Sequence, residues 1–239
     1  MKKPYFVPIL VGAVLIAIIS LLLTSCGESE DPEKTYQFIG FDGVHVDPDL
    51  DIFIQQGDEF AVSASGDPAN LKILHVGITD QNNILFRYID PHKRYPRTQI
   101  RITMPTIHEL SVSDYSTAEM VGFLSDEIET LTMYIRSGSS VVTDGVVDSL
   151  YARLLGAAKL TLTGSGRALK VYANGNSRVE AFSFYATKAN IDITDYSQVY
   201  IHATEKLDAK VSVSSTVFYT GEPEITSEVD DSSVFELIP

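Results

Sequence analysis

The chain is poor in the residues that many binding and structural devices require. It has 239 residues with one cysteine, no tryptophan, and 18 Lys and Arg against 32 Asp and Glu. A single cysteine excludes an intrachain disulfide framework and a multi-cysteine zinc site. The formal net charge of −14 excludes the basic stripe that nucleic-acid phosphates require, and it disfavours electrostatic adsorption to anionic lipid. We therefore expect no nucleic-acid partner.

Motifs for catalysis and metal binding are also missing. The five histidines share no metal-ligand spacing, and Gly164-Ser165-Gly166 lacks the frame of a serine nucleophile elbow. No glycine-rich loop precedes a helix, and the calcium-binding repeat of toxin solenoids does not occur. We expect no catalytic residues, no cofactor and no resident metal, although weak Ca²⁺ binding by isolated aspartates stays open.

The N-terminus has the pattern of an export signal. Lys2 and Lys3 precede an apolar run over residues 7–23, which ends at Leu23-Thr24-Ser25-Cys26. A transmembrane helix would need about 20 apolar residues, and this run is slightly shorter. The last four residues match the bacterial lipobox, whose cysteine is acylated, and Cys26 is the only cysteine. We predict a lipoprotein signal peptide at 1–25 and membrane attachment through lipid on Cys26.

The segment after Cys26 is polar and acidic, which predicts a flexible tether over 26–36 and one domain over 37–237. Acidic residues behind a lipidated cysteine resemble the surface-export signals of Bacteroidetes lipoproteins, and a plain solvated linker is the alternative. The chain is thus expected to be an outer-membrane lipoprotein that faces either the cell surface or the periplasm.

The body of the chain reads as β-structure. Residues alternate between apolar and polar at 51–55, 60–63, 84–88 and 99–104, with turn residues between these stretches. The stretch 66–76 opens with Gly-Asp-Pro and is compatible with a short helical turn.

A repeat begins near Leu110. Its anchor is an apolar residue that follows a small polar pair, and successive anchors are spaced by 23, 19, 19, 20, 18 and 17 residues. The anchors are Ala118, Val141, Leu160, Val179, Val199, Val217 and Val234. A second column contains Leu131, Leu150, Leu169, Ala189 and Leu207, and alternation adds Met133, Ala152, Val171, Ile191 and Ala209 to the buried face. A period near 19 with alternation predicts an all-β solenoid of about seven coils over 110–235. Stacked Ser and Thr can hydrogen-bond along its axis, and the preceding region caps the stack or forms its first coils.

Several of these segments together resemble a known family. They are the strand pattern at 38–62, the 100–105 strand that ends in proline, Leu110, the repeated Ser-Gly-Ser or Ser-x-Val motifs such as Ser137-Gly138-Ser139-Ser140, and residues 219–223. The set resembles the Bacteroidetes family of auto-transporter adhesin head GIN domains over residues 37–235. The resemblance implies a right-handed, single-stranded parallel β-helix carried on lipoproteins, and it transfers no catalytic residues. The chain departs from the Ser-Gly-Ser pattern at 174–177 and 195–197.

Alternation places one row of residues on the outer surface, with neighbours about 5 Å apart along successive coils. The row contains Tyr134, Arg153, Tyr172, Asp192 and Lys210. Tyrosine and cationic side chains stacked in this way suit binding to sugar rings or to a partner surface. The alternative is ordinary cross-strand pairing on a solvated sheet.

A second outward row consists of Tyr200, Phe218 and Phe235. An exposed apolar row indicates a subunit interface, and thus a homo-oligomer, or a surface covered by the N-terminal strands.

Three functions remain open on this basis. The first is a lipid-anchored, non-catalytic, adhesin-like binder of glycan or protein. The second is an envelope scaffold that self-associates. The third is a polysaccharide-active enzyme, for which Asp192 and Asp195 are the best carboxylate pair because they share one coil.

Overall fold

The computed structural model describes residues 32–89, 96–124 and 128–238. The predicted signal peptide and Cys26 lie outside these residues. Among the described residues, no helix is long and apolar enough to cross a membrane. The described residues are β-rich, and one short helix lies among them, α2 (Pro68–Ile73), whose N-cap is Asp67. The strands are β1 (Glu33–Tyr36), β2 (Gly43–Asp47), β3 (Leu50–Gln56), β4 (Ala61–Ser65), β5 (Leu74–Ile78), β6 (Asn83–Tyr88), β7 (Thr98–Met104), β8 (Glu109–Val112), β9 (Thr117–Leu124), β10 (Thr130–Arg136), β11 (Ser140–Leu155), β12 (Lys159–Asn174), β13 (Arg178–Ile193), β14 (Gln198–Val211), β15 (Thr216–Thr220), β16 (Glu224–Val229) and β17 (Val234–Leu237).

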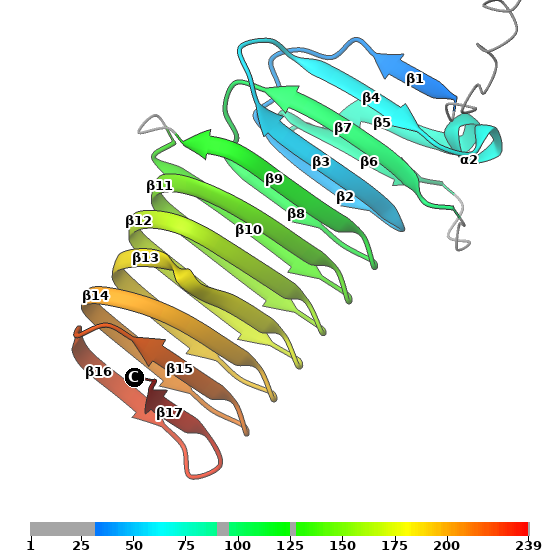
Figure 1. Cartoon of the computed structure of the whole chain (residues 1–239). Coiled ribbons are helices and arrows are strands. Elements are labelled where there is room, and N and C mark those ends of the chain that lie inside the picture. The colour runs from blue at the N-terminus through cyan, green and yellow to red at the C-terminus, as the bar shows by residue number, and fades with distance from the viewer. Residues whose placement is uncertain (1–31, 90–95, 125–127, 239) are drawn as a thin grey trace, which may run out of the picture. The chain divides into compact units, whose positions relative to one another are not determined.

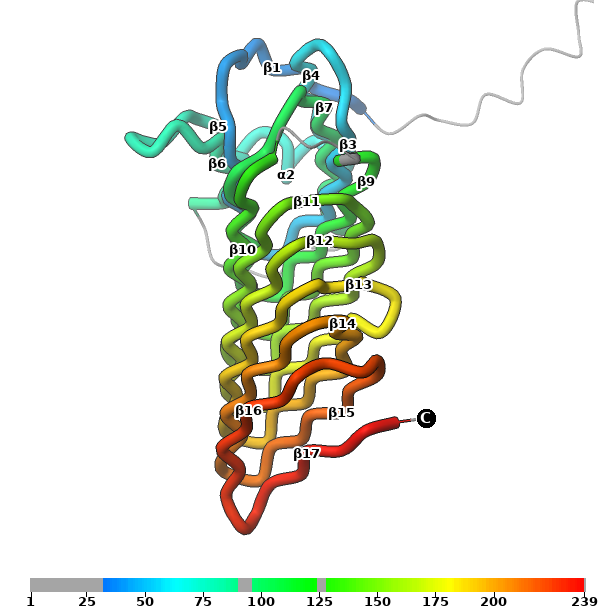
Figure 2. Tube along the Cα trace, turned by 90° about the vertical axis from the view of Figure 1, so that its left-hand side faces the viewer, coloured from blue at the N-terminus to red at the C-terminus, as the bar shows by residue number. Residues whose placement is uncertain are grey.

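These strands wind into a β-solenoid with two main faces (Figure 1). One face, here called the ladder face, is a parallel sheet in the order β6, β2, β8, β10, the second halves of β11 to β14, and β16. The opposite face is a parallel sheet in the order β7, β3, β9, the first halves of β11 to β14, β15 and β17. Seven coils follow one another from β8 to β17, which confirms the predicted parallel solenoid (Figure 2).

The N-terminal region both adds coils and caps the stack. The β2–β3 coil lies between the β6–β7 coil and the β8–β9 coil, so the order of coils along the axis differs from their order in the sequence. Beyond the β6–β7 coil, β5 pairs antiparallel with β6, β4 pairs antiparallel with β7, and β1 pairs antiparallel with β4. Antiparallel strands thus cover the edges that a stack of parallel coils would leave open at this end.

The predicted tether is too long by four residues. Glu33–Tyr36 forms strand β1 and pairs with Val62–Ser65, so the sheet begins inside the segment expected to be flexible. The sequence concealed this strand because Glu33, Lys34 and Thr35 are exposed. Backbone pairing to an edge strand holds this segment without apolar side chains to mark it.

The buried columns lie where the repeat places them. The anchors from Ala118 to Val217 occupy neighbouring coils in register, and none is more than 3% exposed. The column from Leu131 to Leu207 and the one from Met133 to Ala209 are also in register and buried. One coil buries only a few apolar residues, so the core depends on stacking.

The last coil has a different register from the one predicted. Val217 pairs with Phe235, and Val234 pairs with Thr216 and is 43% exposed. The consecutive Ser232 and Ser233 offered two frames, and the structure uses Ser233, whose Oγ accepts the Ser215 N–H at 3.2 Å. Phe235 therefore turns toward the core and stacks on Tyr219 at 4.8 Å between ring centroids.

In six of the seven coils from β8 to β17, a corner with two consecutive residues at positive φ joins the two faces. The pairs are Asp114–Tyr115, Ser137–Gly138, Gly156–Ala157, Gly175–Asn176, Asp195–Tyr196 and Val213–Ser214. The next residue in most coils is a buried serine whose hydroxyl accepts a backbone N–H from the preceding coil. These bonds run from Ala158 to Ser177, from Ser177 to Ser197 and from Ser197 to Ser215, and a similar bond runs from Ser215 to the partly buried Ser233, all at 3.2–3.3 Å. The predicted hydrogen bonding along the axis is thus present.

The other bend of the coil requires small residues. A Cβ added to Gly164, whose φ is +117°, would lie 1.9 Å from the Gly145 carbonyl oxygen. The neighbouring backbone therefore passes where a side chain would begin, and glycine avoids both that clash and the cost of positive φ.

Candidate ligand-binding surface

The predicted ladder exists as one row on the ladder face. Backbone pairing sets Tyr134 beside Arg153, Arg153 beside Tyr172, Tyr172 beside Asp192, and Asp192 beside Lys210. All five side chains are partly or fully exposed. The residues that alternate with them along each strand are buried in the core, so the row is held on a rigid sheet.

Each tyrosine of this region contacts a cation. The Arg153 guanidinium lies 5.0 Å from the Tyr172 ring centroid, and the Arg136 guanidinium lies 5.8 Å from that of Tyr134. In the adjacent row, Lys170 Nζ lies 5.6 Å from the centroid of Tyr151. Such contacts are each worth about 0.5–1 kcal/mol at exposed sites. We call Tyr134, Arg136, Tyr151, Arg153, Lys170 and Tyr172 the tyrosine–cation surface.

Three members of this surface were missed from the sequence. Arg136, Tyr151 and Lys170 stand two residues from the ladder positions, on rows parallel to it. The alternation that gave the ladder also places positions two residues away on the same face. Alternation applied to the adjacent rows therefore predicts all three as outward-facing.

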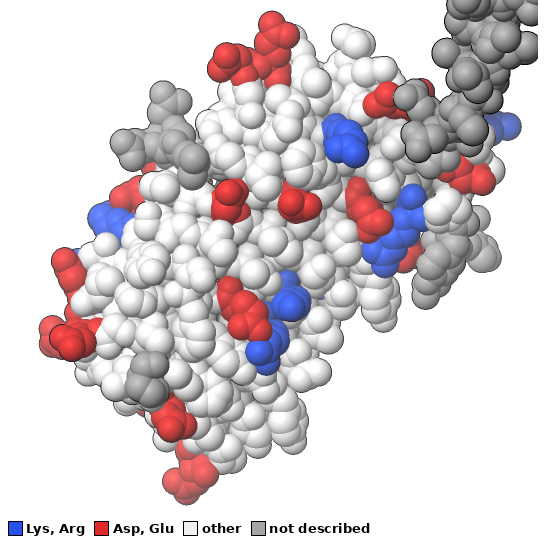
Figure 3. All heavy atoms as spheres, viewed as in Figure 1, with Lys and Arg blue, Asp and Glu red and all other residues white. Residues whose placement is uncertain are grey.

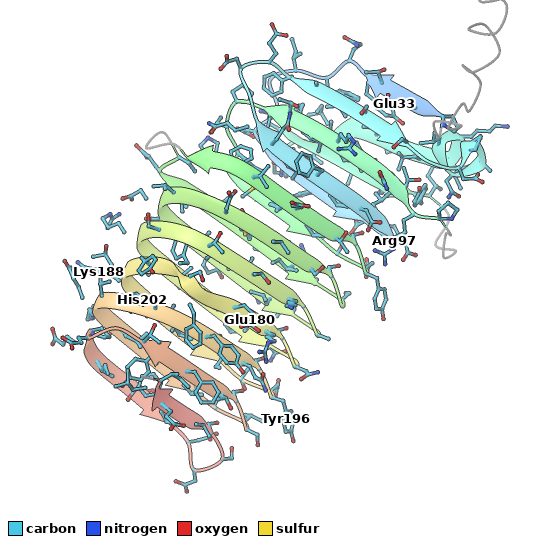
Figure 4. All side chains as sticks on the ribbon, viewed as in Figure 1. Glu33, Arg97, Glu180, Lys188, Tyr196 and His202 are labelled. Carbon is cyan, nitrogen blue, oxygen red and sulfur yellow. The ribbon has the colours of Figure 1, made fainter. Side chains whose placement is uncertain are left out.

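A shallow depression of about 680 Å³ adjoins the tyrosine–cation surface. Tyr151 and three lysines, Lys170, Lys188 and Lys206, line it together with small and apolar residues such as Ala168. Figure 4 shows Lys188 at the edge of the molecule. Lys188 and Lys206 are direct cross-strand neighbours, which is an unfavourable arrangement for like charges. Lys206 Nζ contacts Asp208 Oδ2 at 2.7 Å, and no carboxylate among the described residues forms an ion pair with Lys188.

A second depression, of about 700 Å³, continues around the bend from the first, because Thr130 and Ser149 line both. Arg167 forms a two-pronged ion pair with Asp148 here, with distances of 2.8 Å from Nε to Oδ1 and 2.7 Å from Nη2 to Oδ2. The hydrogen bond from Arg167 lowers the pKa of Asp148. The Arg167 and Asp148 side chains are 61% and 42% exposed, and the pair forms part of the wall of this depression.

The second predicted row is shorter than expected and lies on the opposite face. Tyr200 and Phe218 are neighbours with ring centroids 5.4 Å apart, but Glu236, not Phe235, follows Phe218. Phe235 is therefore removed from the predicted interface row. The structure adds Phe182, edge-on to Tyr200 at 5.4 Å, and Arg178, whose guanidinium lies 4.4 Å from the Tyr200 ring centroid. Most of the opposite face is uncharged, with charged side chains singly or in small groups (Figure 3).

The carboxylates considered for catalysis have other positions. Asp192 belongs to the ladder, between Tyr172 and Lys210. Asp195 lies at a corner with φ of 55°, and its Oδ2 accepts a hydrogen bond from Asn174 Nδ2 at 2.6 Å. Asp195 thus stabilises a bend between two coils.

One polar cluster was not anticipated. His45 Nε2 lies 2.6 Å from Glu109 Oε1, and Asn83 Nδ2 donates to the same oxygen at 2.9 Å. The three residues come from β2, β8 and β6, which the swapped coil order makes neighbours. Sequence spacing could not reveal the cluster because that order is a tertiary feature. Among the described residues, no group of three His, Cys, Asp or Glu side chains is arranged to hold a metal ion.

Solved structures share this fold. A putative adhesin from Bacteroides fragilis superposes with a TM-score of 0.81 at 17% identity, covering 88% of this chain and 98% of that one. A putative lipid binding protein from Parabacteroides distasonis gives a TM-score of 0.70 at 16% identity, covering 89% and 98%. A putative adhesin from Parabacteroides merdae gives 0.65 at 14% identity, with the same coverage.

A search of curated proteins finds no sequence that matches this chain. A family model does match, and its description is "Putative auto-transporter adhesin, head GIN domain". The match spans residues 40–223, from the loop before β2 to the loop after β15, and so includes most of the solenoid. The chain therefore belongs to this family, as its sequence resemblance predicted.

Proposed function

We propose that this protein is a non-catalytic, adhesin-like component of the cell envelope that binds an acidic glycan through the tyrosine–cation surface. The observation that carries the proposal is the cation placed against each of Tyr134, Tyr151 and Tyr172 on one rigid sheet. Family membership supports an adhesin-like role. The lipobox at Cys26 supports lipid anchoring.

The chemistry of the surface favours a sugar with negative charge. A tyrosine ring offers an apolar face for the carbon side of a pyranose and a hydroxyl that hydrogen-bonds. The unpaired Lys188, beside Lys206 in the same depression, supplies charge for a carboxylate or sulfate group. The net charge of −14 makes the chain as a whole repel anionic ligands. The lysines of this depression offset that repulsion locally, so an acidic sugar can approach here.

Binding to defined oligosaccharides tests the proposal. The full chain in detergent is titrated with oligogalacturonate and with a neutral oligosaccharide of the same length, and binding is followed by calorimetry. We expect Tyr151→Ala and Lys188→Glu each to weaken oligogalacturonate binding by about tenfold, or about 1.4 kcal/mol. Tyr200→Ala on the opposite face is the matched control and should bind as the parent does. Equal binding by all three variants would contradict the proposal.

The location is tested by protease treatment of intact cells, with a periplasmic protein as the control. Loss of the signal for residues 36–239 is expected for a surface adhesin. Full protection would place the domain in the periplasm and leave no role in adhesion to other cells.

Self-association is the second candidate, and Tyr200, Phe218 and Phe182 are the observation that favours it. These rings form a partly exposed apolar cluster on the opposite face. A dimer through this cluster would dissociate in Tyr200→Ser/Phe218→Ser, as measured by sedimentation equilibrium. The polysaccharide-active alternative requires that Asp192→Ala or Asp195→Ala abolish turnover of a polysaccharide.

A further inference from the structure

The two ends of the solenoid are finished differently. The N-terminal end is covered by the antiparallel strands β1, β4 and β5. At the other end, β16 pairs with β14 and β17 pairs with β15, and neither strand has a partner on its outer edge among residues 32–89, 96–124 and 128–238. The N–H and C=O groups of these edges can therefore accept another strand.

Core-facing side chains are uncovered at the same end. Leu207 and Val211 are 0% and 1% exposed, yet the residues that continue their columns, Ile225 and Val229, are each 40% exposed. On β17, Leu237 continues the column of Ile201 and Tyr219 and is 52% exposed. Within the described residues, no further coil packs on these side chains, whereas each earlier coil is covered by the next one.

The charge of this end is of one sign. Lys210 is the last basic residue, and every charged residue beyond it is acidic: Glu222, Glu224, Glu228, Asp230, Asp231 and Glu236. Backbone pairing places Glu224 beside Lys206 and Glu228 beside Lys210 on the outer surface of the ladder face. The rows that contain Lys206 and Lys210 therefore end at the outermost strand in Glu224 and Glu228. The side of these carboxylates that faces away from the lysines carries no basic side chain of the described residues.

These features define what would fit on the edge. A strand added to β16 would place alternate side chains over Ile225 and Val229, and the others beside Glu224 and Glu228. Apolar residues suit the first set, and Lys or Arg suits the second. A second copy meeting this end with its own acidic end would bring like charges together, which is unfavourable.

We propose that the β16 edge binds an extended, basic segment of a partner protein by strand addition. Main-chain hydrogen bonds supply the common part of the affinity, and the alternating apolar and basic side chains supply the selectivity. This site lies at the C-terminal end of the stack and does not depend on glycan binding by the tyrosine–cation surface.

The probe is a short fluorescent peptide that alternates Lys or Thr with Ile or Val, and the control peptide has the same composition in scrambled order. Fluorescence anisotropy with the full chain in detergent should show binding of the alternating peptide and binding of the scrambled peptide at least about tenfold weaker. Higher salt should weaken the alternating peptide's binding, because the charged contacts are exposed.

Charge reversal tests the location. Glu224→Lys/Glu228→Lys should weaken binding of the alternating peptide by about tenfold or more. Glu59→Lys/Asp80→Lys carries the same change of net charge at exposed positions of the N-terminal region and should bind within about twofold of the parent. Amide chemical-shift changes in the unmutated protein should concentrate on residues 224–229, which tests the site without any variant.

Three results would overturn the proposal. The first is equal binding of the alternating and scrambled peptides. The second is loss of binding in both charge-reversed proteins, which would show attraction to net charge alone. The third is a concentration-dependent dimer that Ile225→Lys dissociates, which would make a second copy the occupant of this edge.

Discussion

The serine column at the corners gives a prediction with an internal control. Ser139 and Ser177 occupy equivalent corners, and each is 1% exposed. Ser177 Oγ accepts the Ala158 N–H at 3.3 Å and donates to the Asn174 carbonyl at 2.8 Å. Ser139 Oγ is buried with no hydrogen-bond partner among the described residues. The same substitution at the two sites therefore removes the same volume but different hydrogen bonding.

Ser177→Ala should destabilise the fold. It removes the 2.8 Å hydrogen bond to the Asn174 carbonyl, which is worth about 1 kcal/mol. It also leaves the buried Ala158 N–H without its acceptor. That second loss costs only about 1 kcal/mol more, because the 3.3 Å bond it breaks is long and weak. We expect the free energy of unfolding to fall by about 2 kcal/mol. Ser139→Ala removes a buried hydroxyl that has no partner, so it should leave that free energy unchanged or raise it by up to about 1 kcal/mol.

Urea unfolding of the full chain, followed by circular dichroism, measures both variants against the parent. The slope of the unfolding free energy against urea should be the same in all three proteins, since the exposed surface hardly changes. Equal losses at Ser139 and Ser177, or a loss below about 0.5 kcal/mol at Ser177, would refute the idea that the serine column stabilises the stack.

Three further predictions concern the core and the ionisable groups. Phe184→Ala removes a fully buried ring and should lower the free energy of unfolding by about 3–5 kcal/mol in the same urea assay. Burial, and then the nearby Asp114 carboxylate, raises the pKa of Asp47, so its contribution to stability is lost as the pH rises through that raised pKa. Asp47→Asn should therefore flatten the rise of unfolding free energy on acidification below neutral pH, and an unchanged pH profile would contradict this. Hydrogen bonds from Ser233, the Val213 N–H and Ser232 lower the pKa of Asp230 to about 2, so its contribution is present above the ordinary Asp value of 3.8 and lost as the pH falls toward 2. NMR intensities of residues 224–237 should change over that range in the parent and lose this dependence in Asp230→Asn.

One part of the candidate binding surface could be predicted from the sequence, and the other part could not. The ladder from Tyr134 to Lys210 followed from alternation alone, because a parallel stack in register repeats each outward position in the next coil. The lysine-lined depression needed coordinates, because it depends on small side chains such as Ala168 beside long ones such as Lys188 and Lys206. The ligand class proposed for this surface rests on both parts.

The sequence by itself determined the solenoid, its buried columns and its corner serines, because a period near 19 repeats the same environment in every coil. It could not determine features that break the repeat. The β2–β3 coil lies between two coils that follow it in the sequence, and strand β1 pairs through its backbone with few apolar residues to mark it. The register of the last coil depended on whether Ser232 or Ser233 accepts the Ser215 N–H. Ser233 accepts it, and in this register Phe235 pairs with Val217 and faces the core. The residue types determine which positions of each coil are buried, because burial repeats with the period. The order of the coils and the pairing of edge strands depend instead on which strands meet in space.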